Sequence, residues 1–169
     1  MPSRSTMKGS EFLGTARRLL AGAREELPRD SSSPPLPAPP EADLRTAASR
    51  AYYALFLTIR DTLDPGGTLF HGDGRVHGEV SRLLLECWEQ NRQQMTRVGV
   101  AYKTLRSLYA CRTEGDYLRP REMIWSVPAI QRCINGADAQ ISNVHSWDAR
   151  LLYILRELYP RIPPRPARS

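Results

Sequence analysis

Two segments of the chain carry the side chains that are best suited to chemistry. The first covers residues 45–56 and reads RTAASRAYYALF. Helical spacing places Arg50 and Tyr53 on one face of this segment, while Tyr52 is turned about a quarter of the way around. One tyrosine can then fill the core while the other presents its hydroxyl to a partner. The alternative is that this group of side chains only packs and makes one buried hydrogen bond.

The second segment, RTEGDY, begins at Arg112 and ends at Tyr117. Arg112 precedes Asp116 by four residues, so the two could pair on one helix turn or across a dimer, with Tyr117 packed at the helix end. The alternative is that Arg112 binds a phosphate or takes part in catalysis. Of the three histidines, His77 is the strongest candidate for a site. It lies at the start of a predicted helix and could reach a groove between helices, or it could cap or pack there.

The sequence gives no sign of a metal or cofactor. No group of His, Asp and Glu residues has metal-ligand spacing, and we expect no cofactor. The glycine-rich segment 66–78 lacks the Gly-x4-Gly-Lys-Ser/Thr pattern of a phosphate loop and is better explained by turns. Cys87, Cys111 and Cys133 form no CxxC pair, and we expect them to be buried, reduced thiols. Without a signal-peptide core or a long apolar run, the sequence predicts a cytoplasmic protein that does not enter a membrane.

The charge balance favours an anionic partner. The chain of 169 residues has 24 Lys and Arg against 18 Asp and Glu, a formal net charge of +6. Such a surface favours polyanions such as RNA, DNA or nucleotides. The alternative is that the excess reflects the arginine-rich composition of a high-GC genome, with arginines spread over the surface. This alternative stays open because much of the positive charge lies near the chain ends.

Hydrophobic periodicity predicts an all-α bundle. We divide the chain into a flexible N-terminus at residues 1–6, one helical domain at 7–159, and a disordered Pro/Arg-rich tail at 160–169. A proline-rich connection at 28–40 follows the first helix and cannot continue it. The predicted helices cover about residues 7–27, 41–63, 76–91, 98–111 or slightly beyond, 128–144, and a short segment at 147–159.

Four elements in order resemble HEPN-domain proteins, especially the small stand-alone bacterial and archaeal ones. They are the amphipathic segment 12–20, SRAYYALF at 49–56, the pair His77-Gly78, and Arg112-x-x-x-Asp116-Tyr117. The resemblance spans about residues 7–145. It implies a four- to five-helix HEPN-like bundle with a Pro-rich loop after the first helix. HEPN proteins are often dimeric, with a polar groove near the dimer axis.

The resemblance also implies a function. Many HEPN proteins are metal-independent endoribonucleases, with an arginine followed four to six residues later by a histidine. Here Arg112 takes the arginine position, and Asp116 stands where a histidine is expected, so its carboxylate would repel a phosphodiester. A catalytic set would then combine Arg112 and Asp116 with His77 as a substitute proton donor. Arg112, Arg50, Tyr53 and Tyr117 are the candidate phosphate- or RNA-binding residues.

The expectation is therefore a homodimer that binds RNA or nucleotide phosphates in a toxin–antitoxin or defence setting, with at most weak metal-independent endoribonuclease activity. In HEPN toxins paired with a minimal nucleotidyltransferase antitoxin, a tyrosine receives AMP groups, and Tyr117 resembles that position. The alternative is a catalytically inert interaction module that dimerises or docks on a nucleotidyltransferase partner.

Overall fold

The computed structural model describes residues 8–25, 41–70, 76–116 and 125–159, and all of their regular secondary structure is helical. The all-α prediction is thus confirmed for this part of the chain. The predicted N-terminus at 1–6, the Pro-rich loop at 28–40 and the tail at 160–169 lie outside the described residues. The helices are α1 (Gly9–Glu25), α2 (Glu41–Leu63), α3 (Val76–Gln90), α4 (Thr96–Asp116), α5 (Val127–His145) and α6 (Ala149–Leu158).

The helix bounds follow local side-chain chemistry. α2 has the predicted bounds because its alanines favour a helix and Asp64-Pro65 stops it. α5 begins at its Ser126 cap, whose side chain accepts a hydrogen bond from the Ala129 N–H. The fourth predicted helix is longer than expected, since α4 continues through Asp116. The described residues form six helices, more than the four to five that the resemblance implied.

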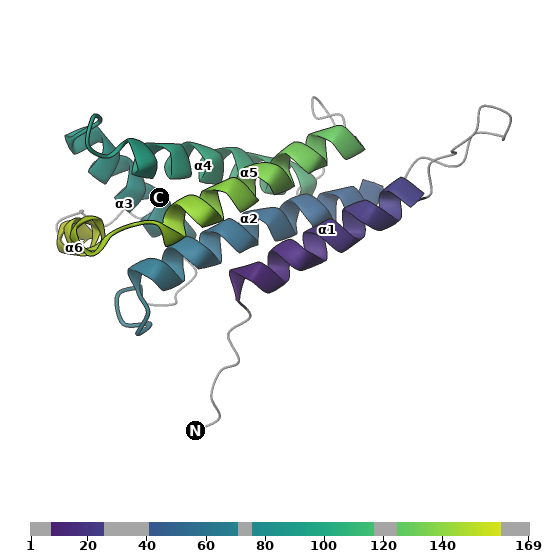
Figure 1. The fold of residues 1–169 in the computed structure, drawn as a ribbon. Coiled ribbons are helices and arrows are strands. Elements are labelled where there is room, and N and C mark those ends of the chain that lie inside the picture. The colour runs from purple at the N-terminus through teal and green to yellow at the C-terminus, as the bar shows by residue number, and fades with distance from the viewer. Residues whose placement is uncertain (1–7, 26–40, 71–75, 117–124, 160–169) are drawn as a thin grey trace, which may run out of the picture.

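α2 is the central helix of the bundle. It packs against α1 on one side and against α4 and α5 on others, while α6 lies across one end near α3 (Figure 1). Because helices surround it, much of α2 must be small or apolar. Four fully buried alanines let the neighbouring helices approach closely: Ala47, Ala48, Ala51 and Ala54.

Two glycines mark the closest helix contacts. A Cβ atom on Gly9 would lie 2.6 Å from the backbone carbonyl oxygen of Ala54, where α1 begins against α2. A Cβ on Gly99 would lie 2.6 Å from the indole ring of Trp88, where α4 crosses α3. Both distances are too short for a real Cβ atom, so any larger residue at Gly9 or Gly99 would force its neighbours to move.

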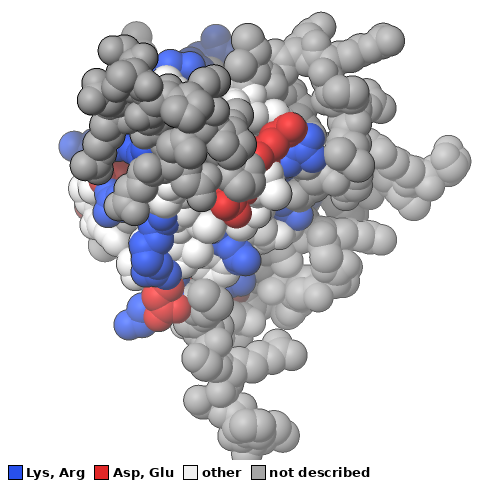
Figure 2. Space-filling view, turned by 90° about the vertical axis from the view of Figure 1, so that its right-hand side faces the viewer, with Lys and Arg blue, Asp and Glu red and all other residues white. Residues whose placement is uncertain are grey.

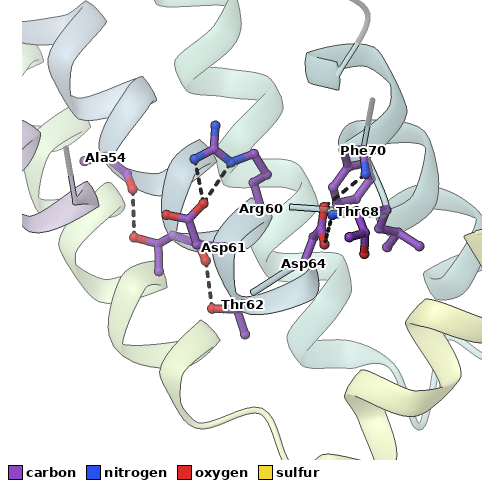
Figure 3. Close-up of polar contacts among 9 residues, drawn as sticks. Ala54, Arg60, Asp61, Thr62, Asp64, Thr68 and Phe70 are labelled. Carbon is purple, nitrogen blue, oxygen red and sulfur yellow. Dashed lines mark hydrogen bonds and ion pairs between the residues drawn. The ribbon is translucent and has the colours of Figure 1, made fainter. Parts of the chain in front are cut away.

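The segment after α2 is held by Asp64 (Figure 3). Its carboxylate accepts hydrogen bonds from the backbone N–H groups of Thr68 and Leu69 at 2.8 Å and of Phe70 at 3.1 Å. Burial favours the neutral acid, but these backbone donors outweigh it and lower the pKa of Asp64. Gly67 has a φ of 67°, which supports the predicted turn. The same view shows Arg60 paired with Asp61 at 2.6 Å on the last turns of α2.

None of the helices described in this structure combines the length and the apolar character that crossing a membrane requires.

Candidate functional site around Tyr52

Tyr52 joins the two segments that the sequence singled out. Its side chain is buried on α2, with 1% of its surface exposed. Its hydroxyl lies 2.8 Å from Nδ1 of His77 on α3. The guanidinium carbon of Arg112 on α4 lies 5.4 Å from the centre of its ring. Three helices therefore bring His77 and Arg112 against one tyrosine.

Arg112 lies over both tyrosines of the SRAYYALF segment. Its guanidinium carbon is 4.7 Å from the ring centre of Tyr53 and 5.4 Å from that of Tyr52. These distances fall within the range of cation–π attraction, which is stronger when the cation is partly removed from water. The Arg112 side chain is half-buried, so part of its charge is shielded from water. The rings of Tyr52 and Tyr53 together hold the guanidinium in place.

The protonation of Tyr52 follows from its surroundings. Burial raises the pKa of Tyr52 above its usual value, an effect that Arg112 opposes through its charge and a hydrogen bond. The phenol therefore keeps its proton at neutral pH. Because its oxygen accepts from Arg112, we assign the phenolic proton as donated to Nδ1 of His77. The neutral imidazole then carries its own proton on Nε2.

His77 is surrounded by aromatic rings. Its ring centre lies 4.0 Å from that of Phe56 and 5.6 Å from that of Tyr52. Burial, and then the positive charges of Arg112 and Arg60, lower the pKa of His77 to about 4. At pH 7 the imidazole is therefore neutral. In this structure the His77 imidazole is neutral and accepts a hydrogen bond at Nδ1. The role of His77 as a proton donor, which the sequence suggested, stays a prediction.

Arg50 extends the site towards α1. Its guanidinium carbon lies 5.3 Å from the ring centre of Phe12, whose ring in turn lies 5.8 Å from that of Tyr53. Two arginines thus bracket two half-buried aromatic rings, in the order Arg50, Phe12, Tyr53 and Arg112. We call these four residues the arginine–aromatic row.

Two predicted site residues fall outside what the structure describes. Asp116 is the last residue of α4, but its side chain is not among the described side chains, and Tyr117 lies in the segment 117–124 outside the described residues. The predicted pairing of Arg112 with Asp116 is therefore untested, as is the role of Tyr117.

Sequence reasoning missed two features of this region. Tyr109, one turn before Arg112, has 39% of its side chain exposed and places its ring 5.6 Å from that of Tyr52. Cys111, the neighbour of Arg112, lies with its sulfur 3.7 Å from that of Cys133 on α5. The spacing of Tyr109 and Arg112 could have indicated the first feature, since residues three apart share a helix face. No spacing rule could have paired the two cysteines.

Charges on the outside of the bundle are mixed. Figure 2 shows Lys and Arg side chains in separate groups on the described part of one end, with Asp and Glu beside some of them. Arg17 pairs with Asp138 at 2.7 Å, and Arg45 pairs with Glu41. Among the described residues, no three His, Cys, Asp or Glu side chains are arranged to hold a metal ion.

Comparison with known proteins yields no relative: no protein-family model, curated protein or solved structure matches this chain.

Proposed function

We propose that this chain is a HEPN-like protein that binds RNA or nucleotide phosphates, with Arg112 as the principal phosphate contact. One observation carries the proposal. Three of the four sequence elements that resemble the HEPN pattern lie on α2, α3 and α4, and their polar members Tyr52, His77 and Arg112 meet at one point. A helical bundle could bury these side chains separately, so their convergence favours a shared role.

The arginine–aromatic row suits a single-stranded nucleic acid. A guanidinium offers five N–H donors in a planar fork that matches phosphate oxygens. Arg112 and Arg50 supply two such charges, and half-buried Tyr53 and Phe12 between them supply ring surface on which a base could stack. Exposed Tyr109 adds a third ring near Tyr52.

The state of His77 favours binding over cleavage. A general acid must hold a proton at the working pH, whereas the pKa of His77 is about 4 and its Nδ1 accepts from Tyr52. Endoribonuclease activity would need a change in this hydrogen bond. We therefore propose phosphate binding as the primary activity, with cleavage as an outcome that the experiment distinguishes.

Titration of a fluorescent single-stranded RNA tests the binding. Arg112→Ala should weaken binding by about 10-fold or more, which corresponds to the loss of a charge-assisted hydrogen bond. Arg106→Ala is the matched control, because Arg106 is an exposed arginine on the same helix. It should stay within about twofold of wild type if binding depends on position rather than net charge. Equal losses in both variants, with unchanged circular dichroism, would overturn the assignment of Arg112.

The same samples separate the remaining alternatives. Cleavage in EDTA that disappears in Arg112→Ala would support a metal-independent endoribonuclease. Absence of both cleavage and RNA binding would leave the inert interaction module, which dimerises or docks on a nucleotidyltransferase. We also propose a homodimer, and a strictly monomeric mass by light scattering across micromolar concentrations would contradict it.

A further inference from the structure

A pair of cysteines joins the two helices beside Arg112. Cys111 lies near the end of α4 and Cys133 lies in α5, and their sulfur atoms are 3.7 Å apart. A disulfide bond is about 2.0 Å long, so the sulfurs need to approach by about 1.7 Å to bond. Both side chains are on well-formed helices that pack against each other, so a small side-chain rotation or helix shift would suffice.

The surroundings make the two thiols unequal. The hydrogen bond from Cys111 lowers the pKa of Cys133 to about 7, against the opposing effect of burial and with help from the charge of Arg132. Cys133 is also the less buried of the two. It therefore supplies the thiolate, which is the reactive form of cysteine. Cys87 is a natural contrast, because burial raises its pKa to about 11.

We propose that Cys111 and Cys133 are a hydroperoxide-sensitive dithiol that closes reversibly to a disulfide between α4 and α5 of one protomer. In the first step, the Cys133 thiolate attacks one oxygen of the hydroperoxide. The O–O bond breaks, Cys133 becomes a sulfenic acid, and the leaving oxygen takes a proton to give water or an alcohol. In the second step, the Cys111 sulfur attacks the Cys133 sulfur. The S–O bond breaks, and the departing hydroxide takes the Cys111 proton as water.

This reaction would act on the neighbouring site without depending on its function. Cys111 directly precedes Arg112, so a disulfide tethers to α5 the turn of α4 that carries the guanidinium over Tyr52 and Tyr53. The bond also closes the chain between positions 111 and 133, and such a link restricts the unfolded chain. We expect oxidation to raise the melting temperature and to slow amide hydrogen exchange in the last turns of α4.

Thiol counting with hydrogen peroxide tests the proposal on the full chain. The reduced protein holds three thiols. After peroxide and denaturation one should remain, with an intact mass lower by two hydrogen atoms and a peptide map that links 111 to 133. A dithiol reductant should restore all three. The Cys87→Ser variant should still lose both of its remaining thiols to the disulfide. The Cys133→Ser variant should form no intramolecular disulfide and should keep both of its thiols.

Several results would overturn the inference. They are a gain in mass from added oxygen without a crosslink, a disulfide-linked dimer on a non-reducing gel, or a crosslink that includes Cys87. In Cys111→Ala the second step cannot occur, so a sulfenic acid on Cys133 should accumulate and react with dimedone. The wild-type peptide map decides the matter even if that variant fails to fold.

Discussion

The environment of His77 makes the stability of the fold depend on pH in a defined window. Its pKa is about 4 in the folded chain, compared with a usual value of 6.5. Below pH 6.5 the unfolded chain therefore binds a proton that the folded chain does not accept until about pH 4. The stabilisation is fully present above pH 6.5 and is lost as the pH falls towards 4.

The size of the effect follows from the shift. Each pKa unit corresponds to about 1.4 kcal/mol, so the full shift sets an upper limit of about 3 kcal/mol. Two considerations reduce what an experiment should show. His77 is only half-buried, and the measurement should stop at pH 5, before ordinary carboxylates titrate. Between pH 7 and pH 5 we expect the neutral histidine to account for about 1 kcal/mol of lost unfolding free energy.

Urea unfolding of wild type and His77→Gln at pH 7 and pH 5 measures this term. The glutamine cannot take up a proton, so wild type should lose about 1 kcal/mol more than the variant over this range. His145→Gln is the matched control, because it makes the same substitution at a histidine that is exposed at the end of α5 and lies outside this site. Equal losses in wild type and His77→Gln would refute the reasoning. So would a His77 titration midpoint near 6.5 in the NMR spectrum of the folded protein.

Two further substitutions test the packing. Gly99→Ala should lower the unfolding free energy by about 1–3 kcal/mol, because its Cβ meets the Trp88 indole at 2.6 Å, and a urea curve measures it. Gly22→Ala, with open space around its Cβ, should instead be about as stable as wild type or more stable, and the reverse order would contradict the contact. Asp64→Asn should cost about 1–2 kcal/mol at pH 7, since it replaces a charged acceptor of three backbone N–H groups. That cost should shrink as the pH falls and Asp64 itself becomes protonated, whereas a pH-independent difference would argue against the charge.

The sequence predicted the helices better than it predicted their mutual orientation. α2 had clear start and stop signals in the preceding prolines and in Asp64-Pro65, and its bounds were predicted correctly. The end of α4 was predicted only loosely, at Cys111 or slightly beyond, because the apolar stripe stops there while the helix continues to Asp116. In the last turns of α4 the Thr113 hydroxyl donates a hydrogen bond to the backbone carbonyl of Tyr109. No hydrophobic pattern reveals such a contact.

In the candidate site, too, the sequence predicted the residues but not how they are brought together. Arg112 and His77 were selected from the sequence, but their meeting through Tyr52 depends on how α3 and α4 rotate against α2. That rotation is set by close contacts such as Gly99 against Trp88, which involve residues far apart in the chain. The sequence did predict that one of the two adjacent tyrosines would fill the core, and Tyr52 is that residue.

The central position of α2 has a consequence for synthesis on the ribosome. α2 ends at Leu63, while α5, which covers one of its sides, ends at His145. At about 5–20 residues per second, roughly 4 to 16 seconds separate the two events. During that interval α1, and later α4, can shield parts of α2, but the side that α5 covers stays open. Until α5 has emerged, the nascent chain therefore presents an apolar helix to whatever lies near the ribosome exit, and a chain that stops short of α5 should remain a substrate for chaperones and proteases.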